Sequence, residues 1–144
     1  MVMLNGVSVT PLSRIVTEKG NVLHAMKCVD DSFVSFGEAY FSEVDFTAIK
    51  GWKKHSKMFL NLIVPIGNIK FVLFDDRENS DTYQKYFDVI IGEVNYQRLS
   101  IPPGIFVAFQ GISESKNMLL NIASILHDPN ESISRELNEF SYEW

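Results

Sequence analysis

The chain has 144 residues, a length typical of one domain, and 46% of them are hydrophobic, which favours a packed core over disorder. Its net charge of −5 argues against nucleic-acid binding through a broad basic surface, but it is compatible with a local basic pocket. The single cysteine, Cys28, excludes an intrachain disulfide and favours a reducing compartment. The first residues lack the pattern of a signal peptide, and no apolar run is long enough to span a membrane. We therefore expect a cytoplasmic protein with no membrane partner.

Short apolar segments separated by turn residues recur along the chain and predict β-strands. From the N-terminus we expect a short strand within residues 1–9, a brief strand or helical turn over 22–26, and a longer strand over 33–42. Residues 49–77 predict two central strands with a turn at Gly67-Asn68. Further strands are predicted over 87–91, and over 105–112 and 118–123 as a pair around a polar turn. The tail from residue 132 has weak periodicity and is compatible with a helical turn.

This succession of short strands indicates the fold class. No helical pattern alternates with the strands, which argues against a parallel α/β sheet. Many short strands with turns at short intervals are typical of a sandwich or barrel. The sequence therefore predicts an all-β fold in a single domain over residues 1–144.

A basic segment lies within the first central strand. Lys53, His55 and Lys57 occupy every second position, so in a continuous strand they would share one face. Three basic side chains on one face would attract an anionic ligand, and the flanking ammonium groups would favour the neutral form of His55. A neutral imidazole can act as a general base. The alternative interpretation is a solvated basic strand edge.

Two other groups of residues have competing interpretations. The run Asp75-Asp76-Arg77 is either a ligand clamp or, as we prefer, an ion pair that holds a turn. Tyr40 and Tyr142 are candidate proton donors, but a tyrosine in an all-β core most often has a packing role.

Three motifs give the chain its likeness to a known family: Asp75-Asp76-Arg77 followed by Ser80 and Thr82, then Ile101-Pro102-Pro103-Gly104, then His127-Asp128-Pro129-Asn130-Glu131. Over about residues 19–131 the chain resembles the cupin-fold dTDP-4-dehydrorhamnose 3,5-epimerases and the shorter sugar-nucleotide ketoisomerases. The resemblance implies an antiparallel jelly-roll barrel, a homodimer, and no metal or other cofactor. It also implies a nucleoside-diphosphate 4-keto-sugar as substrate, with a dTDP-linked sugar as one candidate.

The resemblance assigns roles to individual residues. His55 matches the second histidine of the ketoisomerases' Arg-Gly-x-His-Ala-His motif, and Lys53 stands where the epimerases have their base, so these two are the candidate catalytic residues. Leu120 stands where the epimerases have their acid, a tyrosine. The positions implied for substrate binding are Lys19, His24, Glu38 and Lys50.

The same alignment predicts no metal site. Metal-binding cupins use three histidines and a carboxylate, whereas the matching positions here hold a poor set of ligands. They are Lys53, His55, Phe59 or Leu60, and Val107.

The leading hypothesis is a sugar-nucleotide epimerase or isomerase in deoxysugar or polysaccharide biosynthesis. One alternative is a non-catalytic nucleotide-sugar-binding module, which the leucine at the acid position favours, and another is a dimeric scaffold in glycan assembly. The leading hypothesis predicts that Trp52 and Lys54 point out of the barrel. It also predicts that four basic side chains converge on one cavity, namely Lys19, Lys50, Lys53 and His55.

Overall fold

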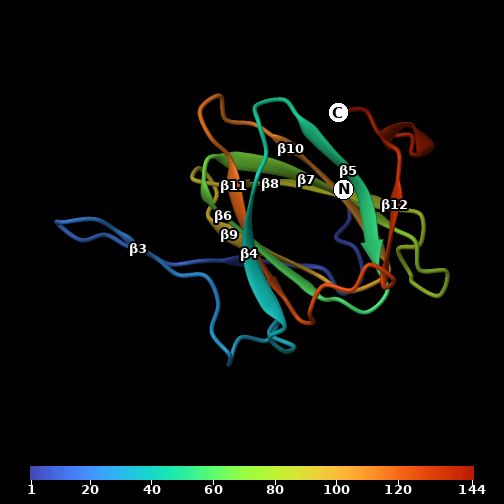
Figure 1. The fold of residues 1–144 in the computed structure, drawn as a ribbon, viewed down its shortest axis with the longest axis horizontal. Helices are drawn as coiled ribbons and strands as arrows, with labels where there is room; N and C mark the ends of the chain where they lie inside the picture. Colours follow the sequence, from blue (N-terminus) through green and yellow to red (C-terminus); the bar gives the residue numbers. More distant parts are fainter.

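The computed structural model describes residues 1–144, and nearly all of its regular structure is β-strand (Figure 1). The first sheet contains, in spatial order, β1 (Ser8–Pro11), β9 (Gln97–Ile101), β6 (Leu60–Ile66), β11 (Met118–Ala123) and β4 (Glu38–Glu43). The second sheet contains β12 (Ser132–Arg135), β5 (Ile49–His55), β10 (Ile105–Gly111), β7 (Asn68–Asp75) and β8 (Tyr86–Gly92). A separate hairpin pairs β2 (Arg14–Ile15) with β3 (Val22–Leu23), and a short 3₁₀ helix, η1, covers Leu137–Glu139.

All strand pairs in the two sheets are antiparallel, which confirms the predicted all-β jelly-roll fold. None of the helical structure is long and apolar enough to cross a membrane.

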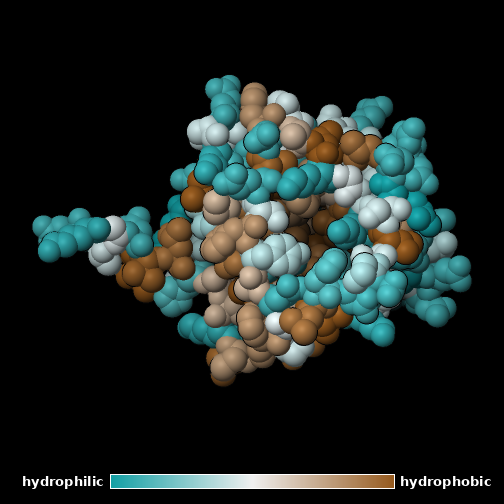
Figure 2. All heavy atoms as spheres, in the orientation of Figure 1, coloured by the Kyte–Doolittle hydropathy of each residue, from teal (hydrophilic) through white to brown (hydrophobic).

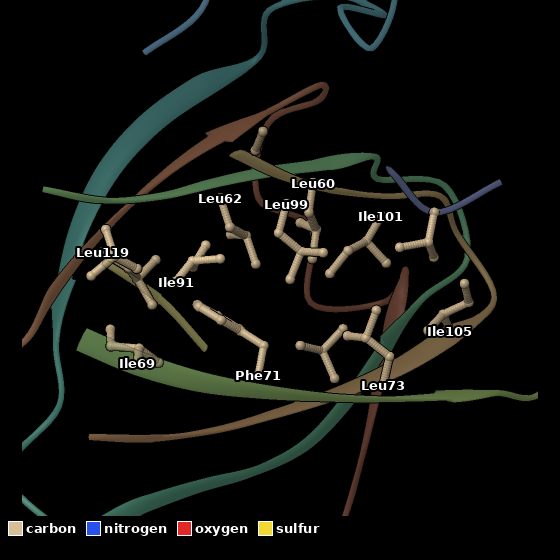
Figure 3. Packing of buried hydrophobic residues seen from close by; sticks show 14 of the residues in the cluster. Leu60, Leu62, Ile69, Phe71, Leu73, Ile91, Leu99, Ile101, Ile105 and Leu119 are labelled. Atoms are coloured by element: carbon tan, nitrogen blue, oxygen red, sulfur yellow. The ribbon is translucent and has the colours of Figure 1, made fainter. Parts of the chain in front are cut away.

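The core lies between the two sheets, because alternate residues of each strand point inward. Leucine and isoleucine side chains of β6, β9 and β11 face Phe71 and its neighbours on β7 and β10 (Figure 3). Phe71, Leu73 and Leu99 are fully buried. Removing such a side chain from water contributes about 1.5–3 kcal/mol, so this interior stabilises the packing of one sheet on the other.

The C-terminal tail forms a second apolar layer on the outer face of the second sheet. Trp52 points out of the barrel, as predicted, but it is only 1% exposed because the tail covers it. Its ring lies 4.8 Å from that of Phe140 and 6.2 Å from that of Trp144, measured between centroids. Lys54 also points outward and pairs with Asp76. The tail therefore supports the middle of β5 from behind.

The predicted two-strand arrangement of residues 49–77 is wrong, because the segment forms three strands. β5 ends at His55, and the chain then crosses from the second sheet to the first before β6 begins at Leu60. The second turn, at Gly67, lies where we expected it, with the positive φ of 74° that favours glycine. Lys57 lies in the crossing, so it does not share a strand face with Lys53.

Three other strand predictions also need correction. The predicted strand over 33–42 begins only at Glu38, since residues 33–36 have no regular structure and Gly37 forms a bend. The strands β10 and β11 are not a pair, because they belong to opposite sheets. The N-terminal strand is β1, which extends to Pro11 rather than lying within residues 1–9, and β9 was missed.

The hairpin of β2 and β3, together with its turn, projects from the barrel as an arm (residues 13–24; Figure 1). The base of the arm is held by the Arg14 guanidinium, which donates to the Glu93 carbonyl at 2.6 Å, and by the Tyr96 hydroxyl, which donates to the His24 carbonyl at 2.8 Å. Beyond this base the arm exposes apolar side chains to solvent: Ile15, Val16, Val22 and Leu23.

The Asp75 carboxylate holds the loop after β7. It is fully buried and accepts hydrogen bonds from Arg77 (2.8 Å from Nε), Ser80 (2.7 Å) and Thr82 (2.6 Å). Burial alone would raise the pKa of Asp75, but these hydrogen bonds hold it well below its usual range. The interpretation of Asp75 and Arg77 as an ion pair that holds a turn is confirmed.

We expect Asp75→Asn to lower the free energy of unfolding by about 3 kcal/mol, because it removes the charge that Arg77 needs in a buried pair. Urea unfolding measures this as a lower midpoint with an unchanged slope. Asp76→Asn is the matched control, since its pair with Lys54 is partly solvated and should cost about 1 kcal/mol or less. Equal losses for the two variants would contradict this account of the loop.

Candidate active site

A cavity of about 310 Å³ opens between the two sheets, and both β4 and β5 contribute residues to its lining. Figure 2 shows a hollow with a hydrophobic floor and hydrophilic side chains at its rim. The second sheet contributes Lys50, Gly51, Lys53, His55, Val107 and Phe109 to the lining. The first sheet contributes Tyr40, Ser42, Leu60, Leu62, Leu119 and Asn121. One wall is therefore basic, and the facing wall is neutral.

A β-bulge in β5 creates the basic wall. Lys53 pairs with Val107 and Lys50 pairs with Phe109, so two residues of β5 oppose a single residue of β10. A strict alternation would place Lys50 on the opposite face from Lys53 and His55. Because the bulge inserts one residue, all three basic side chains line the cavity. Lys50 therefore lines the cavity, as expected from the resemblance, whereas Lys57, which strand alternation placed on the same face, does not.

His55 is oriented by a buried carboxylate, Glu131. The His55 Nδ1 atom is hydrogen-bonded to Glu131 Oε1, and the side chains are 13% and 3% exposed. The other carboxylate oxygen accepts from the backbone N–H groups of Ser56 and Lys57, both at 3.1 Å, and of Met58 at 3.2 Å. With Nδ1 engaged, Nε2 is the nitrogen of His55 that is free to act in the cavity.

The pKa of Glu131 reflects these contacts. Burial raises it, but the hydrogen bonds from His55 and from the backbone of Lys57 and Met58 lower it more, so the pKa lies below its usual value of 4.5. Glu131 is therefore an anion at neutral pH, and its charge lies directly against the imidazole.

The three sequence motifs converge around this histidine. The Gly104 N–H donates to the His55 carbonyl at 2.8 Å, and the Gly104 carbonyl accepts from the Asp76 N–H at 3.3 Å. Gly104 has a φ of 90°, and a Cβ there would lie 2.5 Å from Cγ of Arg77, so only glycine fits this turn. Since Glu131 belongs to the third motif, all three motifs meet at the end of β5.

The facing wall carries a polar pair, Tyr40 and Asn121. The Asn121 Nδ2 atom donates to the Tyr40 hydroxyl at 3.0 Å, and the two residues lie opposite each other in the register of β4 and β11. Leu120, the residue aligned with the epimerases' acid, does not line the cavity, whereas its neighbours Leu119 and Asn121 do. The leucine at position 120 therefore does not show whether the cavity contains an acid.

The sequence-predicted site residues fall into two groups. Lys50, Lys53 and His55 come together in the cavity, and neither lysine forms an ion pair within the chain. Lys19 lies near the tip of the arm, exposed and away from the cavity, so three of the four basic residues predicted to converge there line it.

The other two predicted binding residues, His24 and Glu38, do not line the main cavity. His24 lies at the base of the arm beside a smaller pocket. Glu38 begins β4 on the same strand face as Tyr40, and its Oε1 atom is buried without a hydrogen-bond partner.

Sequence reasoning missed two residues of the site and undervalued a third. Glu131 was visible as the end of a family motif, but no role was attached to it. Asn121 gave no signal, because its importance depends on the strand opposite it. Tyr40 was named as a possible donor but was interpreted as packing.

No group of three or more histidine, cysteine, aspartate or glutamate side chains is arranged to hold a metal ion.

We expect Glu131→Gln to change how stability depends on pH. Because the folded pKa of Glu131 is lowered, its ionised form contributes stability above pH 4.5, and this contribution is lost as the pH falls through the folded pKa. The difference in free energy of unfolding between parent and variant should therefore be largest near neutral pH and shrink in acid. Urea unfolding from about pH 7 to about pH 3 measures it. A constant difference over that range would refute the assignment.

The chain is similar to several known proteins. It is 34% identical to a dTDP sugar isomerase of known structure from Desulfovibrio desulfuricans, over 100% of this chain and 95% of that one, with a TM-score of 0.94. It is 25% identical over 127 residues to a probable low-salt glycan biosynthesis epimerase, Agl13, from Haloferax volcanii (87% of this chain, 81% of that protein). It is also 25% identical over 129 residues to the spore coat polysaccharide biosynthesis protein SpsL from Bacillus subtilis (90% and 85%).

No family model matches the chain. The identity with the dTDP sugar isomerase nevertheless extends over nearly the whole of both chains, at a high TM-score. The chain therefore belongs to the cupin-fold family of dTDP-sugar isomerases and sugar-nucleotide epimerases, the family that its motifs resemble.

Proposed function

We propose that this protein is an epimerase or isomerase of a nucleoside-diphosphate 4-keto-hexose in deoxysugar or glycan biosynthesis. The observation that carries the proposal is the His55–Glu131 pair on the wall of a cavity that also contains two unpaired lysines. The similarity to a dTDP sugar isomerase and to a glycan biosynthesis epimerase supports the same class of substrate.

In this proposal His55 is the base that removes the proton from the carbon next to the C4 ketone. Its Nε2 atom is free, since Nδ1 is held by Glu131. The carboxylate keeps the imidazole in one orientation and stabilises the imidazolium that forms when the proton is taken up. Lys53 is a weaker candidate for this role, because an ammonium group must first lose its proton.

The two lysines of the bulged strand provide the anion site. Lys50 and Lys53 present ammonium groups to the cavity without a carboxylate partner, so their charge is available to a diphosphate or to an enolate oxygen. The apolar floor formed by Leu60, Leu62 and Val107 suits the less polar face of a deoxysugar.

We also propose a homodimer in which the arm of each protomer packs on the other. An isolated two-stranded hairpin is marginally stable in water, and this one exposes Val16 (79%) and Val22 (51%). Figure 2 shows hydrophobic side chains gathered on the arm near the barrel. The first sheet ends at an edge strand, β4, whose Phe41 is also exposed. A two-fold dimer would cover these side chains, and it would bring Lys19 of one protomer to the cavity of the other.

The test of the reaction is hydrogen exchange in deuterated water. With a dTDP-4-keto-6-deoxyhexose we expect the parent to incorporate deuterium next to the ketone, and His55→Asn to lose this exchange because no base remains. NMR or mass spectrometry of the recovered sugar measures it.

Lys50→Ala is the complementary variant. It should bind the nucleotide sugar about 1.5–3 kcal/mol more weakly, as expected for loss of a hydrogen bond to a charged group, whereas His55→Asn should bind nearly as the parent does. Calorimetry separates the two effects. A parent that binds the sugar nucleotide but never exchanges a proton would instead be a non-catalytic binding module.

We predict that light scattering at micromolar concentration gives twice the chain mass of 16.4 kDa. Changing Val16 and Val22 together to Asp should shift the mass toward the monomer, because the arm could then no longer pack on an apolar surface. Leu126→Asp, at another exposed apolar residue, is the control and should leave the dimer intact. A monomeric parent would refute the proposed assembly.

A further inference from the structure

The neutral wall of the cavity contains one titratable side chain, Tyr40. It lies on β4 in the first sheet, whereas His55 lies on β5 in the second, so the two groups approach a bound ligand from opposite walls. We propose that Tyr40 is the proton donor of the reaction. This inference rests on the proposed function, because it assigns the second proton transfer of the same chemistry.

The hydrogen bond to Asn121 prepares Tyr40 for this role. Asn121 Nδ2 donates to the phenolic oxygen at 3.0 Å, and the O–H of Tyr40 donates to no protein group, so it is free to point at a ligand. After the hydroxyl has given up its proton, the same amide N–H stabilises the phenolate oxygen. Asn121 is itself only 3% exposed, so its amide group is held in place by the residues packed around it.

A second observation at the same place indicates a ligand. The Oδ1 atom of Asn121 is buried and has no hydrogen-bond partner, although Asn121 lines the cavity. Buried acceptors are nearly always satisfied, so a donor is missing here. A hydroxyl group of a sugar bound against Tyr40 would supply that donor and would place the ring within reach of the phenol.

The proton transfers balance without any further reactant. His55 Nε2 takes the proton from the carbon next to the ketone, and the electrons of that C–H bond form the carbon–carbon double bond of an enolate. Tyr40 then donates its proton to the opposite face of the same carbon, and the electrons return to restore the ketone. The configuration at that carbon is inverted, and exchange with water resets the imidazolium and the phenolate.

The test compares Tyr40→Phe with the parent in deuterated water, with a dTDP-4-keto-6-deoxyhexose as the probe. Loss of a general acid should slow epimer formation about 100-fold or more. Deuterium should still enter the recovered substrate, because His55 can remove a proton and return a deuteron to the same face. Calorimetric affinity for the probe should equal that of the parent. Tyr83→Phe, in the loop after β7 and without a hydrogen bond from its hydroxyl, is the matched control and should behave as the parent.

Three results for Tyr40→Phe would each overturn the assignment: epimer formation at the parental rate, parallel loss of exchange and epimerisation, or loss of affinity for the probe. The second would place Tyr40 in the enolisation step, and the third would make it a binding residue. If the parent protein shows no exchange, the proposed function is wrong. This outcome is distinguishable from failure of the Tyr40 assignment, because it is measured on the parent alone.

Discussion

The site depends on the carboxylate of Glu131. Its two oxygens bind the imidazole of His55 and three consecutive backbone N–H groups, at Ser56, Lys57 and Met58. These contacts hold the turn at which the chain leaves the second sheet and crosses to the first. The interaction that orients the candidate base is therefore also the one that fixes the connection between the two sheets. A buried anion with this many donors is stable, whereas the same group without them would be strongly unfavourable.

The two sheets contribute different chemistry to the cavity. The bulged strand of the second sheet presents Lys50, Lys53 and His55, and the first sheet presents Tyr40 and Asn121. A ligand between them would meet positive charge and a base on one side, and a neutral hydrogen-bonding pair on the other. This division follows from the jelly-roll arrangement, because β4 and β5 are consecutive in the chain but belong to opposite sheets. The aromatic tail behind Trp52 supports the bulge from outside.

Local pattern predicted much of the fold and about half of the site. Alternating apolar residues located most strands, and the basic face correctly indicated Lys53 and His55. The errors arose where pairing is not local. Residues 105–112 and 118–123 look like a hairpin, yet their strands belong to opposite sheets, because each buries its inward face against a different partner. The bulge that brings in Lys50 is a feature of the ladder between β5 and β10, so alternation within one strand could not reveal it.

The sequence by itself determined the fold class and the presence of a basic segment, because these follow from composition and from the period of side-chain alternation. Its motifs also determined the family. Only the tertiary structure decided that Glu131 binds His55, that Tyr40 lies against Asn121, and that Leu120 does not line the cavity. Each of these contacts joins residues 76 or more positions apart or depends on strand register. The physical reason is that the partners of a side chain across a sheet are set by how strands pair and how sheets pack, neither of which is encoded in the neighbouring residues.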